Sequence, residues 1–218
     1  MGLKFRNKDA CSKNKTAYLY PDSLISEQYR SIRTNIQFSY GKKDRQSILI
    51  TSPNNREGKS VTAVNLALSL TQQKHRVLLV DANIKNPSLH TTFSLSNTSG
   101  LTDVLSNKIL YDMAILKTEI GRLDVLPSGP SILNSAELIG SETMYDLIKE
   151  TLTSYEYVII DGPSVLEQSD TKILASLCDN VVLVVRSEKT AAEKAAEAKR
   201  FLELAKANII GVVLNEKR

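Results

Sequence analysis

The sequence predicts an α/β fold, a doubly wound and mainly parallel sheet with helices on both faces. Short runs of Val, Ile and Leu recur along the chain and are nearly continuous, as expected for strands that are buried on both faces. Segments with helical spacing of apolar residues separate these runs, which favours alternating strands and helices. The chain has 218 residues, 42% apolar and 24% charged, so it can bury a large core without disulfides.

The elements follow in order along the chain. We expect residues 1–22, which are polar and non-periodic, to form a flexible basic arm ahead of a single domain over residues 23–218. The apolar residues within 23–40 recur with helical spacing, which predicts a helix that ends at Gly41. Strands are predicted over 47–52, 76–81, 123–126, 157–161, 180–186 and 209–214, and further helices over 60–73, 137–154 and 190–207. The arm is typical of a solvated tail, and the alternative is attraction to an anionic membrane surface.

Composition excludes several classes of protein. No apolar run approaches the roughly 20 residues that cross a bilayer, and the N-terminus lacks the apolar core of a signal peptide. The two cysteines, Cys11 and Cys178, form neither a disulfide framework nor a metal-binding spacing. The net charge of +4 is small. The sequence also lacks the alternation of basic and aromatic residues that is typical of nucleic-acid-binding proteins. We therefore expect a cytoplasmic protein with no nucleic-acid partner.

A phosphate-binding loop is predicted between a buried strand and the helix after it. Residues 50–60 read Ile-Thr-Ser-Pro-Asn-Asn-Arg-Glu-Gly-Lys-Ser, and the last three match the end of a Walker A motif. In such a loop backbone N–H groups and the helix N-terminus bind phosphate, Lys59 bridges the β- and γ-phosphates, and the Ser60 hydroxyl ligates magnesium. Pro53 stands where the motif has its first glycine, so the alternative is an ordinary turn with a solvated lysine. The predicted cofactors are ATP and Mg²⁺, and the predicted nucleotide-binding residues here are Asn55, Arg56, Glu57, Gly58, Lys59, Ser60 and Val61.

Two acidic residues end buried strands, Asp81 and Asp161. Ligands of open parallel sheets sit beyond the carboxyl ends of the strands, so both carboxylates are expected to reach the same crevice as Lys59. Each acid could instead cap the next helix or turn. Three polar groups at equivalent strand ends favour a metal–phosphate site. We predict Ser60, Asp81 and Asp161 as the magnesium-binding residues and Lys59, Asp81 and Asp161 as the catalytic residues.

Taken in order, the motifs resemble the bacterial tyrosine kinases of capsule and exopolysaccharide operons. The resemblance covers about residues 26–215. Besides the Walker A loop, it is carried by Glu27-x-x-Arg30-x-x-Arg33, by residues 77–87 at the position of the second acidic motif (Walker A′), by Asp161-Gly162-Pro163 at the Walker B position, and by Val213-Leu214-Asn215. No single motif is unique, but the ordered set is specific. Asn215 resembles the end of the strand beside the adenine, which adds it to the nucleotide-binding residues.

The resemblance implies an ATP-dependent protein-tyrosine kinase that regulates polysaccharide synthesis and export. Its partners would be protein substrates with tyrosine and a membrane-spanning activator, the polysaccharide co-polymerase, which would recruit it to the inner face of the cell membrane. Asp161 would hold magnesium through water, and Asp81 would activate the acceptor hydroxyl or hold the metal's water shell.

The family's helix motif implies a homo-oligomeric ring. Glu27, Arg30 and Arg33 have i, i+3, i+6 spacing, which predicts one shared helix face. The alternative is a solvated charged stripe.

The sequence departs from the family pattern in the chemistry. Arg56 stands where the family has glycine, Asn83 replaces the second Walker A′ acid, Lys85 replaces an arginine, and Ser164 replaces the second Walker B proline. The family's tyrosine cluster is absent, the last tyrosine being Tyr157. An amide cannot act as a base. We therefore expect nucleotide binding to persist and phosphoryl transfer to be weaker by about an order of magnitude or more.

Two rival functions remain open. One is a catalytically degenerate nucleotide-binding regulator or scaffold of the same pathway. The other is a partition-type P-loop ATPase, although that class carries a lysine early in the loop where this chain has Asn54.

Overall fold

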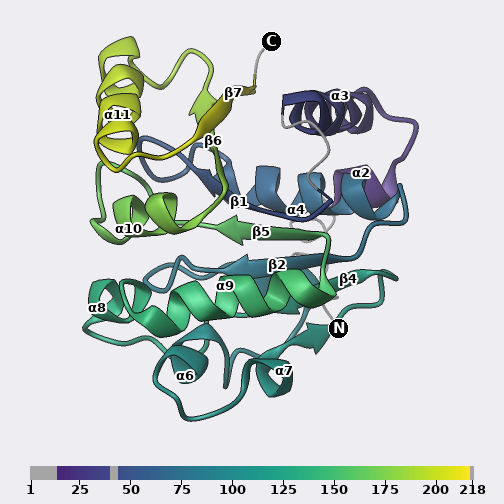
Figure 1. The fold of residues 1–218 in the computed structure, drawn as a ribbon. Helices are drawn as coiled ribbons and strands as arrows, with labels where there is room; N and C mark the ends of the chain where they lie inside the picture. Colours follow the sequence, from purple (N-terminus) through teal and green to yellow (C-terminus); the bar gives the residue numbers. More distant parts are fainter. Residues whose placement is uncertain (1–13, 40–43, 217–218) are drawn as a thin grey trace, which may run out of the picture.

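The computed structural model describes residues 14–39 and 44–216, which build one sheet of seven strands. The strands are β1 (Gln46–Thr51), β2 (Val77–Asp81), β3 (Leu116–Lys117), β4 (Leu123–Leu126), β5 (Tyr157–Asp161), β6 (Asn180–Arg186) and β7 (Ile209–Asn215). Their order in space is β3-β4-β2-β5-β1-β6-β7 (Figure 1). All neighbours pair in parallel except β3, which runs antiparallel to β4.

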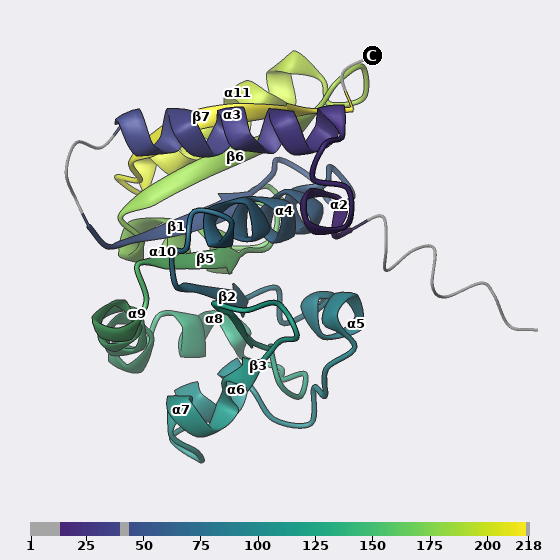
Figure 2. The same ribbon diagram turned by 90° about the vertical axis from the view of Figure 1, so that its right-hand side faces the viewer.

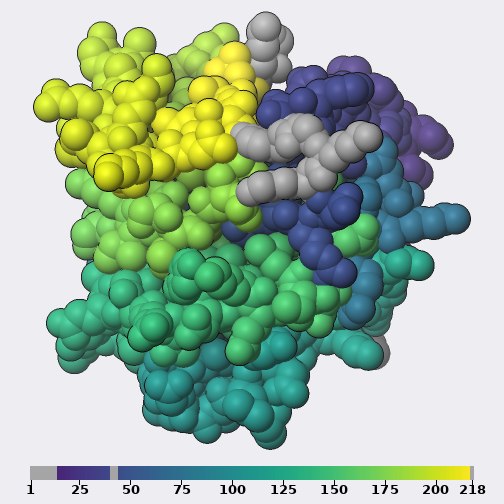
Figure 3. All heavy atoms as spheres, in the orientation of Figure 1, coloured from purple at the N-terminus to yellow at the C-terminus, as the bar shows by residue number. Residues whose placement is uncertain are grey.

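Helices cover both faces of this sheet (Figure 2). One face carries α2 (Thr16–Leu19), α3 (Leu24–Ser39) and α4 (Lys59–Thr71), with α4 on the central strands and α3 beside α4, next to β7. The other face carries α8 (Ser135–Ile139), α9 (Glu142–Ser154), α10 (Asp170–Leu177) and α11 (Ala192–Leu204). Three short helices lie in the segments around β2 to β4, namely α5 (Leu89–Phe93), α6 (Leu101–Leu105) and α7 (Tyr111–Ala114). In Figure 3 the side chains of α9, in green, form part of the surface across the middle of this face of the molecule.

The strands are buried on both sides, which explains their continuous apolar sequence. In β1, Ile48 and Ile50 belong to the core under α4, whereas Leu49 belongs to the core under α9 and α10. All three side chains are fully buried. A parallel strand with helices on both faces needs apolar residues at every position. The predicted doubly wound α/β fold is confirmed.

The structure differs from the sequence-based expectation in several short elements. The helix predicted over 137–154 is two helices, α8 and α9, which separate at Gly140 and Ser141. The elements α5, α6, α7, β3 and α10 were not predicted, because each has eight residues or fewer and too few turns for an apolar period to stand out. Within the described ranges, no helix is long and apolar enough to cross a membrane.

The N-terminal segment packs on the domain where a flexible arm was expected. Ala17 of α2 is buried, and its backbone N–H donates to Asn65 Oδ1 on α4 at 2.8 Å. The Ala17 carbonyl accepts from the Gln72 amide at 2.8 Å. The expected arm over residues 1–22 is therefore wrong for residues 14–22, because buried hydrogen bonds fix a segment that lacks any apolar period. Residues 1–13 lie outside the described ranges.

Candidate functional site

The loop between β1 and α4 has the geometry that a phosphate-binding loop requires. Gly58 precedes the first residue of α4 and has φ +95°, a left-handed conformation that favours glycine. A Cβ on Gly58 would lie 2.0 Å from Asn215 Nδ2, and that amide donates to the Glu57 carbonyl at 3.0 Å. Asn215 at the end of β7 therefore lies directly against the loop. Arg56 is also left-handed, with φ 62°, so it occupies a backbone position that suits glycine.

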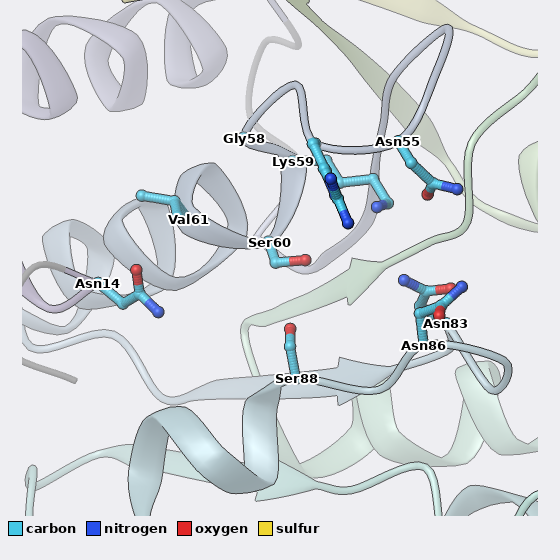
Figure 4. A pocket seen from close by; sticks show the side chains of 10 residues that line it. Asn14, Asn55, Gly58, Lys59, Ser60, Val61, Asn83, Asn86 and Ser88 are labelled. Atoms are coloured by element: carbon cyan, nitrogen blue, oxygen red, sulfur yellow. The ribbon is translucent and has the colours of Figure 1, made fainter. Parts of the chain in front are cut away.

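A cavity of about 410 Å³ opens beside this loop. Figure 4 shows its lining residues, with Val61 and Asn14 at one end and Asn55, Asn83 and Asn86 at the other. Its full lining is Asn14, Asn55, Arg56, Gly58, Lys59, Ser60, Val61, Asn83, Asn86 and Ser88. The charged groups in that lining are both cations, and the helix N-terminus adds partial positive charge. The cavity therefore suits a polyphosphate.

Asp81 holds the loop between β2 and α5, which contributes Asn83, Asn86 and Ser88 to the cavity. Its Oδ2 accepts the backbone N–H groups of Ser88 and Leu89, each at 2.9 Å, and its Oδ1 accepts that of Asn83 at 3.3 Å. Burial raises the pKa of Asp81, and these hydrogen bonds lower it in part. The carboxylate thus has the capping role considered as the alternative, and its two oxygens are both engaged.

Asp161 is the neighbour of Asp81 in the sheet and is arranged differently. The two residues are register partners of β2 and β5. Asp161 is fully buried, and neither carboxylate oxygen has a hydrogen-bond partner among the described residues. Burial first, and then the charge of Asp81, raise the pKa of Asp161 to about 7, while Lys59 and the Ser60 hydroxyl lower it. An unpartnered buried acid beside a phosphate-binding loop is suited to hold a cation.

The residues present fit magnesium. Mg²⁺ prefers oxygen ligands, keeps several waters, and usually takes one or two carboxylates together with phosphate oxygens. Ser60 and Asp161 offer such oxygens. No group of three or more His, Cys, Asp or Glu side chains that could hold a metal occurs within residues 14–39 and 44–216. The nucleotide's own phosphates would therefore complete the coordination.

Comparisons with known proteins identify the family. A family model described as an AAA domain matches residues 47–211. Tyrosine-protein kinase YwqD of Bacillus subtilis (strain 168) is 43% identical over 218 residues, covering 100% of this chain and 92% of the relative. The chain belongs to the bacterial tyrosine-protein kinase family. The resemblance that the sequence motifs indicated is thereby confirmed.

Solved structures agree with this membership of the kinase family. The crystal structure of the chimerical protein CapA2B2 superposes with a TM-score of 0.89 at 39% identity, covering 94% of this chain and 90% of that chain. The kinase domain of Escherichia coli tyrosine kinase ETK gives a TM-score of 0.89 at 28% identity, covering 92% and 78%.

The predicted nucleotide residues of this family member divide into two groups. All of them except Glu57 and Asn215 line the cavity. Glu57 does not present its side chain there, because its buried carboxylate accepts the Asn54 N–H at 3.1 Å and the Thr190 hydroxyl at 2.7 Å. Glu57 therefore shapes the loop from inside and offers only its backbone.

The helix motif expected to form the kinase ring is not one exposed face. Arg33 is buried at 8% exposure and donates to the Ser69 carbonyl and hydroxyl on α4, at 2.5 and 3.1 Å. The i, i+6 spacing rotates Arg33 about 120° from Glu27 around the helix, which turns it inward. Arg33 therefore does not share a solvent-facing surface with Glu27 and Arg30, and the oligomer contact stays a prediction. Glu27 is exposed and Arg30 is partly exposed, and the two pair with each other, Arg30 Nε lying 2.8 Å from Glu27 Oε2.

Sequence reasoning missed three residues of the cavity, Asn14, Asn86 and Ser88. Ser88 is the N-cap of α5, but its hydroxyl is buried and makes no capping bond, because Asp81 accepts the local N–H groups instead. Asn83 is likewise buried with an unpartnered Oδ1. Ser88 and Asn86 could have been found as neighbours of the Walker A′ motif. Asn14 gave no sequence signal, since only tertiary packing brings it to the site.

Proposed function

We propose that this chain transfers the γ-phosphoryl group of magnesium-bound ATP to tyrosine hydroxyls of proteins, in capsule or exopolysaccharide synthesis. The observation that supports this best is the unpartnered, buried Asp161 beside Lys59 and Ser60 at the phosphate-binding loop. Phosphoryl transfer needs mainly positioning and charge neutralisation. These groups offer both.

The nucleotide would lie along the loop. Gly58, Lys59 and Ser60 would bind its inner phosphates through the loop backbone and the lysine side chain. A second cavity, of about 570 Å³, lies between α3, α4 and β7 and shares Val61 with the first. Asn215 and Val61 line this second cavity, so the nucleoside would extend past Val61 toward Asn215. These placements support the expected nucleotide set.

Magnesium, when bound, neutralises phosphate charge. In this chain the Ser60 hydroxyl would be a direct ligand, and Asp161 would accept hydrogen bonds from the water shell. Asn83 and Ser88 add unpartnered oxygens at the same end of β2. Asp81, whose oxygens are occupied by backbone donors, would fix this shell in place and not take a proton.

The setting proposed for the enzyme follows from the family resemblance. A membrane-spanning activator, the polysaccharide co-polymerase, would recruit the chain to the inner face of the cell membrane. Copies of the chain would assemble into a ring, with Glu27 and Arg30 as the exposed part of the contact and Arg33 as internal support.

A degenerate regulator is the second candidate, and Asn83 favours it. The family's second acid is an amide here, and none of the described residues that line the cavity is acidic. Incubating the purified chain with magnesium and radiolabelled ATP, with and without a cytoplasmic activator peptide, separates the two functions. Phosphotyrosine supports the kinase. Nucleotide binding without phosphotyrosine in either condition would support the regulator, and release of free phosphate alone would favour the partition-type ATPase.

Asn83→Asp is expected to raise phosphotyrosine formation about tenfold, because it restores a proton acceptor. It should also lower the stability of the nucleotide-free chain, since a third carboxylate joins the buried Asp81 and Asp161. The same radiolabel assay and a thermal melt measure both effects. Asn86→Asp, in the exposed part of the same loop, controls for added charge. If Asn83→Asp forms phosphotyrosine no faster than wild type, the proposal that Asn83 weakens phosphoryl transfer is contradicted.

A further inference from the structure

The phosphate-binding loop is joined to the loop that follows β5. The Val165 N–H donates to the Ser52 carbonyl at 2.9 Å, and the Leu166 N–H donates to the Pro53 carbonyl at 3.2 Å. These bonds extend the pairing of β1 and β5 past the strand ends. The two loops therefore lie side by side over the edge of the sheet where the cavity opens.

At the tip of this contact Glu167 holds Asn55. The Asn55 backbone N–H donates to Glu167 Oε1 at 2.9 Å, and the Asn55 side-chain amide donates to Glu167 Oε2. The Ser164 hydroxyl donates to Asn55 Oδ1 at 3.0 Å. The main-chain donor of Asn55 and both ends of its amide are thus engaged within the chain.

Asn55 stands at the end of the cavity where a third phosphate would lie. Figure 4 places it opposite Val61, with Lys59 between. The nucleoside is proposed to leave the cavity at Val61, and the backbone at Gly58 and Lys59 to take the inner phosphates. The terminal phosphate then points toward Asn55.

We propose that Glu167 is a specificity-determining residue that lowers the affinity for nucleoside triphosphate relative to diphosphate. This proposal rests on the proposed binding of nucleotide at the loop. Backbone N–H groups of such loops are donors to phosphate oxygens. Glu167 occupies the Asn55 N–H at the end of the cavity where the terminal phosphate would lie, and it adds a negative charge there. A third phosphate has to displace the carboxylate, whereas a diphosphate does not reach it. Glu167 is exposed and free to swing into solvent, unlike the buried Glu57.

The test compares Glu167→Gln with wild type in magnesium, by competition of ADP and of a non-hydrolysable ATP analogue against a fluorescent ADP. Glutamine keeps an acceptor for the Asn55 N–H and removes the charge. We expect the Kd of the ATP analogue to fall about two- to fivefold, the range of exposed charge interactions, and that of ADP to change less than about 1.5-fold. Glu150→Gln, an equal charge change at an exposed position of α9, should leave both unchanged.

Other results overturn the proposal. Equal shifts for both nucleotides, or no shift for the ATP analogue in Glu167→Gln, would remove the specificity role. A second variant, Glu167→Ala, also removes the acceptor. If it weakens both nucleotides while Glu167→Gln changes neither, Glu167 only positions the loop. Wild-type protein that binds neither nucleotide would defeat the proposed function itself, which is a distinguishable outcome.

Discussion

Gly58→Ala is expected to weaken nucleotide binding by about two orders of magnitude while leaving the chain folded. Gly58 has φ +95°, and a left-handed conformation costs an L-residue about 1–2 kcal/mol. Its new Cβ would also lie 2.0 Å from Asn215 Nδ2, so Asn215 has to release the Glu57 carbonyl, which costs about 1 kcal/mol more. Competition against a fluorescent nucleotide measures the loss.

The matched control for that loop variant is Gly121→Ala. A Cβ at Gly121 meets no atom within 4 Å, so binding and melting temperature should match wild type. Undiminished binding by Gly58→Ala would mean that the phosphate does not sit on this loop.

Asp161→Asn is expected to stabilise the nucleotide-free chain and to reduce phosphoryl transfer at least about 100-fold, since we propose that this residue holds the water shell of magnesium. The folded-state pKa of Asp161 is raised to about 7, above its usual value. Between about pH 4 and 7 the native state therefore binds more protons than the unfolded state, and stability falls as pH rises. Above pH 7 Asp161 is ionised in the folded chain, and its buried charge lowers stability by the full amount.

The stabilisation should be about 1–3 kcal/mol at pH 8, because relief of the buried charge is partly offset by an unpaired amide. For a chain of this size that is a rise of several degrees in melting temperature. It should shrink below about pH 5, where wild-type Asp161 is protonated. Thermal melts of wild type and Asp161→Asn at about pH 8 and about pH 5 test whether the stabilisation shrinks as the pH falls.

Asp81→Asn is the informative counterpart of that substitution. Asp81 accepts three backbone N–H groups, and an amide presents one acceptor and one donor to them. It should therefore destabilise the chain by about 1–3 kcal/mol. Two neighbouring acids with opposite effects on stability would support their distinct roles, whereas destabilisation by both would contradict the unpartnered state of Asp161.

The sequence predicted the features that depend on local pattern. Continuous apolar strands gave the fold class, and the parallel arrangement brought Lys59, Asp81 and Asp161 to one edge, because parallel strands end together there. The capping role of Asp81 could be named only as an alternative. Whether Asp81 caps this turn depends on how the loop before α5 folds back onto its carboxylate.

Features that depend on tertiary packing were not predictable from pattern. Asn14 joins the cavity because α2 is fixed by Asn65, and no periodicity marks that segment. Arg33 looked like part of an exposed stripe, but the neighbouring helix supplies the Ser69 carbonyl that draws it inward. The Glu167 contact with Asn55 joins residues far apart in sequence, through two loops that only the sheet brings together.

The most direct test of whether the loop between β1 and α4 binds the polyphosphate compares wild type with Lys59→Met. The measurement is the binding of a non-hydrolysable ATP analogue in the presence of magnesium. We expect wild type to bind and Lys59→Met to bind about 10- to 100-fold more weakly, the loss expected for a charge-assisted contact with phosphate. Lys199→Met on the exposed face of α11 should bind like wild type. Equal affinity of wild type and Lys59→Met would contradict the assignment of the site.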